Sequence, residues 1–212
     1  MYELLTQITI ELLMSHQPLF NNMEQQGKVA DYLGVPGLIY YRAFMSEKEQ
    51  ATVINEIDGR VWLTDLKRRV QHYGYKYDYK ARRIDASMYV GPLPQFATEI
   101  ANRLFNLGLM SKIADQLIIN EYQPAQGISP HIDCEPCFQD GIATISLGSV
   151  YIMDLTDTLT KTTHHIPLEL GSCLVFSSDA RYRWKHGIKP RTSDNGIRRG
   201  RRISMTFRKV IA

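Results

Sequence analysis

The chain has 212 residues, of which 44% are hydrophobic and 22% charged, so it is long enough to bury one substantial core. This composition excludes collagen-like, low-complexity and wholly disordered proteins, and no apolar run approaches the roughly 20 residues of a membrane-spanning helix. The first residues lack the basic segment and cleavage site of a secretory signal, and three cysteines are too few for a disulfide framework. We therefore expect a cytoplasmic globular protein without membrane contact.

The formal net charge of +3 averages over segments of opposite sign. Residues 181–212 hold eleven Lys and Arg against one acid, and residues 60–83 hold eight against two. Between these segments, residues 121–180 hold one lysine against eight acids. Basic runs are often solvated faces, but this layout also suits an anionic partner, either nucleic acid or small carboxylates.

The first part of the chain is predicted to form helices and a short strand. Residues 1–30 are expected to be an extension with a weakly amphipathic helix, and the segment LIYY at 38–41 to be a strand. Ser46, followed three residues later by Glu49, forms a capping-box pattern. This pattern predicts a helix over about residues 47–57.

Tyrosines occupy every second position from 73 to 79, namely Tyr73, Tyr75, Tyr77 and Tyr79. The alternation predicts an extended segment that carries four phenol rings on one face. Further along, apolar residues at helical spacing predict a second helix near 95–109.

From about residue 116 the chain consists of short apolar segments separated by turns. The expected strands are LIINEY, IATISL, VYIMDL, HHIPLEL, SCLVFS and RISMTFRKV. Strands at such short intervals predict a sandwich or barrel. Helices followed by strands predict an α+β, mainly β fold, in which the helices pack on one face of the sheets.

A histidine and an aspartate stand two residues apart at His131 and Asp133, on the same face of a strand or strand end. With a distant histidine they would form the facial triad that holds Fe(II) and leaves positions open for co-substrates. His164 and His165 lie between two predicted strands, where we expect a surface loop. His186 precedes a glycine that allows close backbone approach, so we expect His186 to be the third ligand.

The last predicted strand has one polar face, formed by Arg202, Ser204, Thr206 and Arg208. Two arginines directed into a sheet interior are costly unless they are paired, and a dicarboxylate offers bidentate partners. Two alternatives remain open at this point: resident Asp or Glu side chains pair with the arginines, or the polar face is solvated.

Four motifs, in this order and spacing, together resemble the AlkB family of Fe(II)- and 2-oxoglutarate-dependent dioxygenases. They are Asn120-x-Tyr122, His131-x-Asp133, His186-Gly187-Ile188 and the R-x-S-x-T-F-R of residues 202–208. The resemblance covers roughly residues 35–210. It implies a double-stranded β-helix (jelly-roll) core, with N-terminal helices on one face and a substrate-recognition lid. We therefore expect an extension at 1–30 and one oxygenase domain at 31–212, with the lid region at 31–92 and a helix plus the jelly-roll core at 93–212.

The resemblance also implies a role for each motif residue. The iron ligands would be His131, Asp133 and His186, and the residues contacting 2-oxoglutarate would be Asn120, Tyr122, Arg202, Ser204 and Arg208. Arg202 would pair with the distal carboxylate of 2-oxoglutarate, and Arg208 would lie near the carboxylate that chelates the metal. The implied cofactors are Fe(II) and 2-oxoglutarate, with O₂ as co-substrate. The implied reaction hydroxylates or oxidatively demethylates a substrate and releases succinate and CO₂.

Family members act mostly on nucleobases, and a base in a duplex must be unstacked to reach a buried metal. Trp62, Tyr73 and Tyr75 fall where relatives carry a lid, so we expect them to bind substrate by stacking, although ordinary core packing is the alternative. The phosphate contacts are expected at Lys67, Arg68 and Arg69. The expected partner is single-stranded DNA, RNA or tRNA, and the protein is expected to be a monomer.

Two features favour different branches of the family. Glu135 matches a position where DNA-repair members place an acid near the exocyclic amine of the base. The run that begins at Arg181, a further predicted substrate residue, is closer to the tRNA-modifying branch, which hydroxylates a modified wobble uridine. The two remaining alternatives are a protein or small-molecule hydroxylase on the same scaffold and a nucleic-acid-binding module with an inactive site.

The Cys134-x-x-Cys137 pair could belong to a zinc site or a redox couple. Because no second pair exists, we expect neither and interpret these cysteines as oxidation-prone free thiols near the metal.

Overall fold

The computed structural model describes residues 27–64 and 67–211. The helix expected in the N-terminal extension falls on residues 1–26, which lie outside the described residues; residues Lys28–Val29 form a short strand, β1. Within the described part of the chain, no helix is long and apolar enough to cross a membrane.

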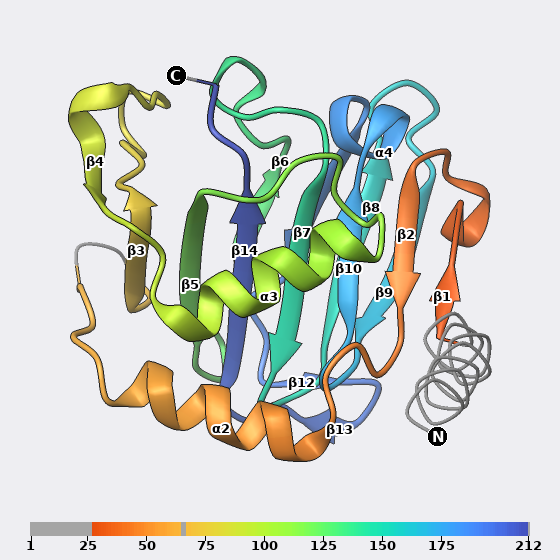
Figure 1. Cartoon of the computed structure of the whole chain (residues 1–212). Coiled ribbons are helices and arrows are strands. Elements are labelled where there is room, and N and C mark those ends of the chain that lie inside the picture. Colours follow the sequence, from red (N-terminus) through yellow and green to blue (C-terminus); the bar gives the residue numbers. More distant parts are fainter. Residues whose placement is uncertain (1–26, 65–66, 212) are drawn as a thin grey trace, which may run out of the picture.

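Two antiparallel sheets form the body of the molecule (Figure 1). The larger sheet has the order β1-β2-β10-β7-β14-β5-β3-β4. Its further strands are β2 (Leu38–Tyr41), β3 (Val70–Tyr75), β4 (Tyr89–Gly91), β5 (Gln116–Tyr122), β7 (Ile142–Leu147), β10 (Cys173–Phe176) and β14 (Arg202–Arg208). The smaller sheet has the order β6-β11-β8-β9, with β6 (Ile128–His131), β8 (Tyr151–Asp157), β9 (Thr163–Leu168) and β11 (Trp184–Ile188). β12 (Ser193–Asp194) and β13 (Ile197–Arg198) form a separate hairpin.

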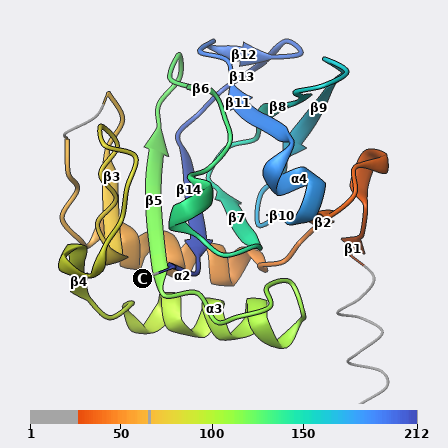
Figure 2. The ribbon, with the colours of Figure 1, turned by 90° about the horizontal axis from the view of Figure 1, so that it is seen from above.

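Two long helices, α2 (Glu47–Asp58) and α3 (Gln95–Asn106), cover the outer face of the larger sheet (Figures 1 and 2). The expected capping box is present, because the Glu49 backbone amide donates to Ser46 Oγ while Glu49 Oε2 accepts from the Ser46 amide. The helices bury Ile57, Ile100 and Leu104 against the sheet. This first core therefore lies between the two helices and the larger sheet.

A second core lies between the two sheets and contains Tyr40, Leu155, Ile166, Leu174 and Trp184. Apolar residues therefore line both faces of the larger sheet, whereas the smaller sheet turns one face to solvent. This arrangement confirms the predicted α+β, mainly β fold with a jelly-roll core and helices on one face. A short helix, α4 (Ser178–Tyr182), connects β10 to β11.

All six apolar segments expected after residue 116 are strands. The surface-loop prediction for His164 and His165 is wrong, because both lie within β9. His165 Nδ1 is 2.7 Å from Asp154 Oδ1, and the His164 ring stacks on Trp184. Each has a local partner, and neither lies near His131.

The predicted single face of tyrosines is also wrong. β3 ends at Tyr75, and Gly74 within it has a φ of +76°. A Cβ at this position would lie 1.8 Å from the Asp115 carbonyl oxygen, so glycine lets β3 approach the start of β5. This distortion breaks the alternation. Tyr73 packs against the helix-side core, whereas Tyr75 and Tyr77 pack on a small cluster formed by Cys134, Cys137, Phe138 and Val210.

Candidate metal centre and co-substrate cavity

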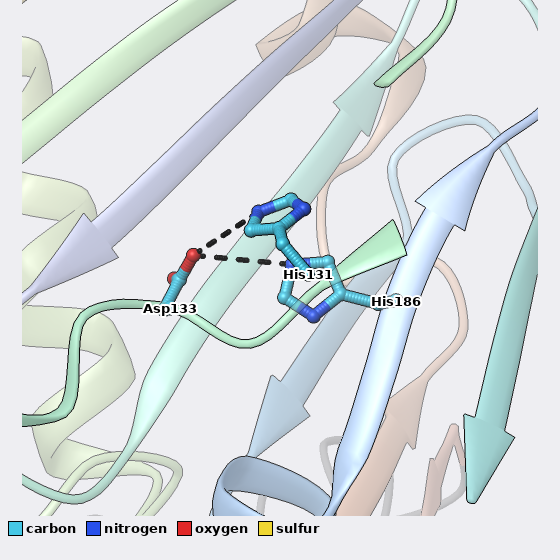
Figure 3. A group of neighbouring side chains, drawn as sticks. All are labelled: His131, Asp133 and His186. Atoms are coloured by element: carbon cyan, nitrogen blue, oxygen red, sulfur yellow. Dashed lines mark ion pairs between the residues drawn. The ribbon is translucent and has the colours of Figure 1, made fainter. Parts of the chain in front are cut away.

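Strand pairing in the smaller sheet brings the three predicted metal ligands together (Figure 3). His131 ends β6 and is the direct register partner of His186 in β11, so the imidazole centroids lie 4.4 Å apart. Asp133 follows in the loop after β6, with Oδ1 3.4 Å from His131 Nε2 and 3.9 Å from His186 Nε2. One possible ligand atom from each residue lies within 4.8 Å of the others.

The backbone around these ligands explains their orientation. At Gly187 a Cβ would lie 2.9 Å from the Pro130 nitrogen, so glycine lets β11 approach β6. His131 Nδ1 lies 2.8 Å from the Ser129 carbonyl oxygen, which can only accept a hydrogen bond. Nδ1 therefore carries a proton, which leaves Nε2, 3.4 Å from Asp133 Oδ1, as the nitrogen that would bind a metal.

The charge states of the ligands also suit a divalent cation. Burial lowers the pKa of His186 to about 3, assisted by the neighbouring His131, so this imidazole is neutral. Burial alone would raise the pKa of Asp133, but Arg208 and the two histidines outweigh it and hold that pKa well below its usual range. Two imidazoles and one carboxylate are the donor set expected for Fe(II).

A cavity between the sheets extends from the three ligands, and it is lined by all five predicted co-substrate residues: Asn120, Tyr122, Arg202, Ser204 and Arg208. They face the same side because β14 pairs with β5 in a register that sets Arg202 opposite Tyr122 and Ser204 opposite Asn120. Alternation along two paired strands therefore assembles this wall.

Arg202 is a buried cation without a carboxylate partner within the described residues. Its side chain is 1% exposed, Nη2 donates to Ser146 Oγ at 2.8 Å, and Nε has no hydrogen-bond partner in the described part of the chain. Burial lowers the pKa of Arg202 to about 10. A carboxylate in the cavity would satisfy both its charge and its free donor, so these residues fit 2-oxoglutarate.

Arg208 differs from Arg202 because a resident acid already pairs with it. Its Nε donates to Asp133 Oδ2 at 3.0 Å, and Nη1 donates to Gln116 Oε1 at 3.3 Å. The alternative that resident acids pair with the arginines thus holds for Arg208 and not for Arg202. The Arg208 contact leaves Asp133 Oδ1 directed at the two histidines.

Arg181 and the other predicted substrate residues lie in different surroundings. Arg181 lines the cavity but is 3% exposed, and its guanidinium donates to the backbone carbonyls of Asp133 and Cys134 at 2.9 and 3.1 Å. Trp62 and Tyr73 pack partly buried against the helix-side core, outside the cavity lining. The Tyr75 ring meets the Tyr89 ring edge-on, and Glu135 is exposed in the turn after Asp133.

The three basic residues predicted to contact phosphate point in different directions. Arg68 Nε donates to Asn120 Oδ1 at 2.8 Å, on the cavity side of β5. Arg69 turns to the helix side, where it binds Glu121 through two hydrogen bonds and lies over the Trp62 ring. Lys67 is exposed and lines a groove of about 450 Å³ that also contains Arg68 and Lys189.

Two polar residues that accept hydrogen bonds from the cavity arginines were not predicted from the sequence. Ser146 accepts from Arg202, and Gln116 accepts from Arg208. The alternation of Thr144 and Ser146 in the predicted strand IATISL is a signal that could have identified the first. Gln116, at the start of β5, carries no comparable pattern.

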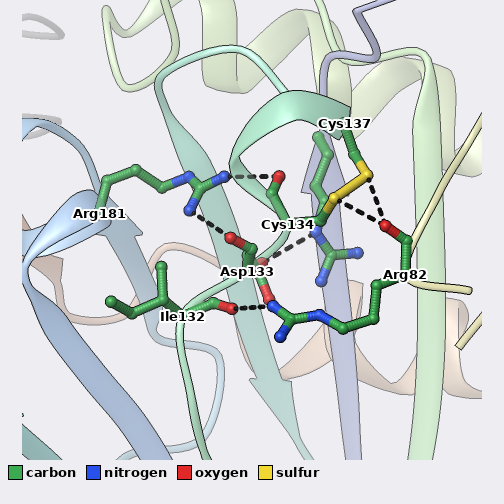
Figure 4. The surroundings of a disulfide bond; sticks show 7 residues. Arg82, Ile132, Asp133, Cys134, Cys137 and Arg181 are labelled. Carbon is green, nitrogen blue, oxygen red and sulfur yellow. Dashed lines mark hydrogen bonds and ion pairs between the residues drawn. A yellow bond between two sulfur atoms is a disulfide. The ribbon is translucent and has the colours of Figure 1, made fainter. Parts of the chain in front are cut away.

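The loop that follows Asp133 is cross-linked (Figure 4). Cys134 and Cys137 form a disulfide, so the interpretation of these residues as free thiols is wrong; Cys173 is the free cysteine and is buried. Two arginines hold the same loop: Arg181 from α4, and Arg82, whose Nη2 donates to the Ile132 carbonyl at 3.4 Å. A short disulfide loop and two side chains from elsewhere therefore restrain the backbone beside a predicted metal ligand.

Comparison with known proteins agrees with this geometry. A family model described as the 2OG-Fe(II) oxygenase superfamily matches residues 60–208. The chain is 35% identical to an Arabidopsis thaliana protein named "Alkylated DNA repair protein ALKBH8 homolog", over 84% of this chain and 59% of the relative. It is 34% identical to the Xenopus tropicalis "tRNA (carboxymethyluridine(34)-5-O)-methyltransferase alkbh8", over 82% of this chain and 32% of that protein. The chain thus spans less than two thirds of each of these two relatives.

The solved structure titled "The structure of OsALKBH1" shares the fold, with a TM-score of 0.65 and 18% identity over 82% of this chain and 97% of that chain. The family resemblance inferred from the four motifs is confirmed, and with it the predicted enzyme class and cofactors. The chain belongs to the 2OG-Fe(II) oxygenase superfamily and, within it, to the AlkB family of Fe(II)- and 2-oxoglutarate-dependent dioxygenases.

Proposed function

We propose that this oxygenase oxidises a modified base in nucleic acid, and that its first substrate class is a tRNA with a modified uridine at position 34. The observation that carries the proposal is the basic groove beside the cavity. It presents Lys67, Arg68 and Lys189, of which Lys189 pairs with Asp154 in the groove wall, and it shares Ile128 and Ile188 with the cavity wall. A base entering the cavity would thus leave its neighbouring phosphates beside the exposed Lys67.

In this proposal the chain's own residues hold and orient the reactants. His131, Asp133 and His186 would hold Fe(II), Arg202 would bind the distal carboxylate of 2-oxoglutarate, and Asn120 and Tyr122 would donate hydrogen bonds to it. When bound, Fe(II) and 2-oxoglutarate would, with O₂ as the oxidant, supply the hydroxylation of a substrate C–H bond, with release of succinate and CO₂.

The surrounding side chains keep this site ordered and dry. Arg208 holds one Asp133 oxygen, and Arg181 holds the backbone carbonyl of the same residue. Phe176 stacks on His186, and Ile142 and Met153 line the cavity. Such apolar walls exclude water from the place where the substrate C–H must lie.

Similarity between this chain and the Xenopus relative supports tRNA as the first substrate class, because the name of that protein refers to carboxymethyluridine at position 34 of tRNA. The methyl transfer in that name is not part of the proposal for this chain. The family match over residues 60–208 and the cavity residues indicate oxygenase chemistry instead.

Oxidative demethylation of alkylated DNA is the second candidate. The name of the Arabidopsis relative, which refers to the repair of alkylated DNA, favours this candidate. The exposed Glu135 also favours it, because this carboxylate lies in the same restrained loop as Asp133 and is accessible to the exocyclic amine of a base.

One experiment separates these candidates. Protein loaded with Fe(II) is incubated with 2-oxoglutarate and, side by side, total tRNA, N-methylated single-stranded DNA and methylated RNA, and the nucleosides are analysed by mass spectrometry. We expect a gain of one oxygen on a modified uridine from tRNA, matched by succinate and absent with His131→Ala. Loss of a methyl group from DNA alone would favour the second candidate, and no change in any nucleic acid would contradict both.

A further inference from the structure

We propose that Arg68 is a positioning residue for 2-oxoglutarate: from the segment that precedes β3, it orients the Asn120 carboxamide toward the co-substrate. This inference rests on the proposed role of Asn120 as a 2-oxoglutarate ligand. It assigns Arg68 a function different from the phosphate contact predicted from the sequence.

Arg68 contacts the two β5 residues that would bind the co-substrate. Its Nε lies 2.8 Å from Asn120 Oδ1, and its guanidinium carbon lies 5.6 Å from the centroid of the Tyr122 ring. The same ring receives the Arg202 guanidinium at 5.4 Å. Arg68 and Arg202 thus both contact the Tyr122 ring, and Arg68 also lines the groove outside the cavity.

The hydrogen bond defines which way the Asn120 amide faces. A guanidinium has donors and no acceptor, so the Asn120 atom that contacts Arg68 must be the oxygen. The amide NH₂ group is then left for the cavity, where a carboxylate or keto oxygen can only accept. Without Arg68, the amide can rotate and present its own oxygen to the anionic co-substrate, which would be repulsive.

The neighbouring residues show that this orientation is specific to position 68. Successive residues of an extended segment point to opposite sides, and Arg69 accordingly turns to Glu121 on the helix face of β5. Lys67 is exposed at the groove. β3 pairs with β5 through Val70 and Asn120, which sets Arg68 two residues ahead of that pair.

The test measures 2-oxoglutarate binding to Mn(II)-loaded protein by calorimetry under anaerobic conditions, together with succinate formation by the Fe(II) enzyme. We expect Arg68→Met to raise the dissociation constant and the KM for 2-oxoglutarate about tenfold, with Mn(II) affinity unchanged. Arg68→Lys, which keeps a donor and the charge, should recover part of the loss. The matched control Lys67→Met makes the same charge change one residue away and should leave 2-oxoglutarate binding unchanged.

Asn120→Ala and the double variant separate this inference from the proposed function. If Arg68 acts through Asn120, Arg68→Met should add little to the loss already caused by Asn120→Ala. Normal 2-oxoglutarate binding in Asn120→Ala itself would overturn the role proposed for Asn120. A normal dissociation constant in Arg68→Met, with nucleic-acid binding weakened as in Lys67→Met, would show that Arg68 contacts phosphate and would overturn the inference alone.

Discussion

The candidate cavity and the segment at residues 60–91, part of the predicted lid region, are built on different kinds of backbone. The co-substrate wall lies on β5 and β14, whose seven-residue register fixes each side chain relative to the next, and the pair His131–His186 faces across β6 and β11. This segment has only β3 and the short β4 in the sheet, and side-chain contacts such as Arg68–Asn120, Arg69–Glu121 and Arg82–Ile132 hold it in place. Strand register thus assembles most of the cavity wall, whereas individual side-chain contacts dock the neighbouring segment.

Removing a metal ligand tests the register-built site most severely. His186→Ala should abolish stoichiometric metal binding and lower succinate formation by at least about 100-fold, because the remaining two ligands cannot hold the ion in place. Metal content by mass spectrometry and succinate by chromatography check this. The control is His165→Ala, whose imidazole pairs with Asp154 on the smaller sheet; equal loss in both variants would contradict the assignment.

Arg202→Met should produce the next largest effect and should separate affinity from stability. Arg202 lines the cavity, has no resident acid and has no hydrogen-bond partner for Nε within the described residues, so its loss should raise the KM for 2-oxoglutarate about 30-fold or more. The same change removes a buried unpaired cation, so the ligand-free protein should become more stable by about 1 kcal/mol. Succinate formation at varied 2-oxoglutarate concentrations gives the KM, and thermal unfolding of the ligand-free protein gives the stability. An unchanged KM together with a less stable apoprotein would show that Arg202 has a structural role instead.

The contrast between cavity and lid also explains what the sequence could reveal. Period-two alternation placed His131 with Asp133 and Arg202 with Arg208 on shared faces, whereas Asn120 and Tyr122 were assigned through the resemblance to the AlkB family. The tyrosine face failed because one close approach at Gly74 interrupts that period. The partners of Arg68 and Arg69 lie about fifty residues away in the chain, and no local pattern encodes such contacts.

Glu121 links the two regions, and its loss should affect stability more than chemistry. Hydrogen bonds from Arg69 and Arg201 lower the pKa of Glu121 to about 2 despite its burial, and Arg201 also binds Asp58 at the end of α2. Glu121→Gln should reduce the free energy of unfolding at pH 7 by about 2 kcal/mol. Because the folded-state pKa is depressed, this contribution is complete above about pH 4.5 and is lost as the pH falls toward 2.

Urea unfolding of wild type and Glu121→Gln at several pH values checks this, and the difference between them should shrink below pH 4.5. Glu56→Gln, which breaks the exposed pair with Arg60, is the control and should change stability by less than about 0.5 kcal/mol. A constant difference at all pH values would mean that packing, and not charge, accounts for the effect.

Lys67→Met should have the smallest effect and tests the lid as a phosphate-binding surface. Lys67 forms no ion pair within the described residues and faces the groove, so it is available to a phosphate. The variant should weaken tRNA binding only a few-fold and should lower the slope of log affinity against log salt by about 1. Fluorescence anisotropy over a salt series measures this, with Lys48→Met on the exposed face of α2 as the control. An unchanged slope in Lys67→Met would remove Lys67 from the nucleic-acid interface, and a changed slope in Lys48→Met would indicate that net charge, and not the groove, governs the association.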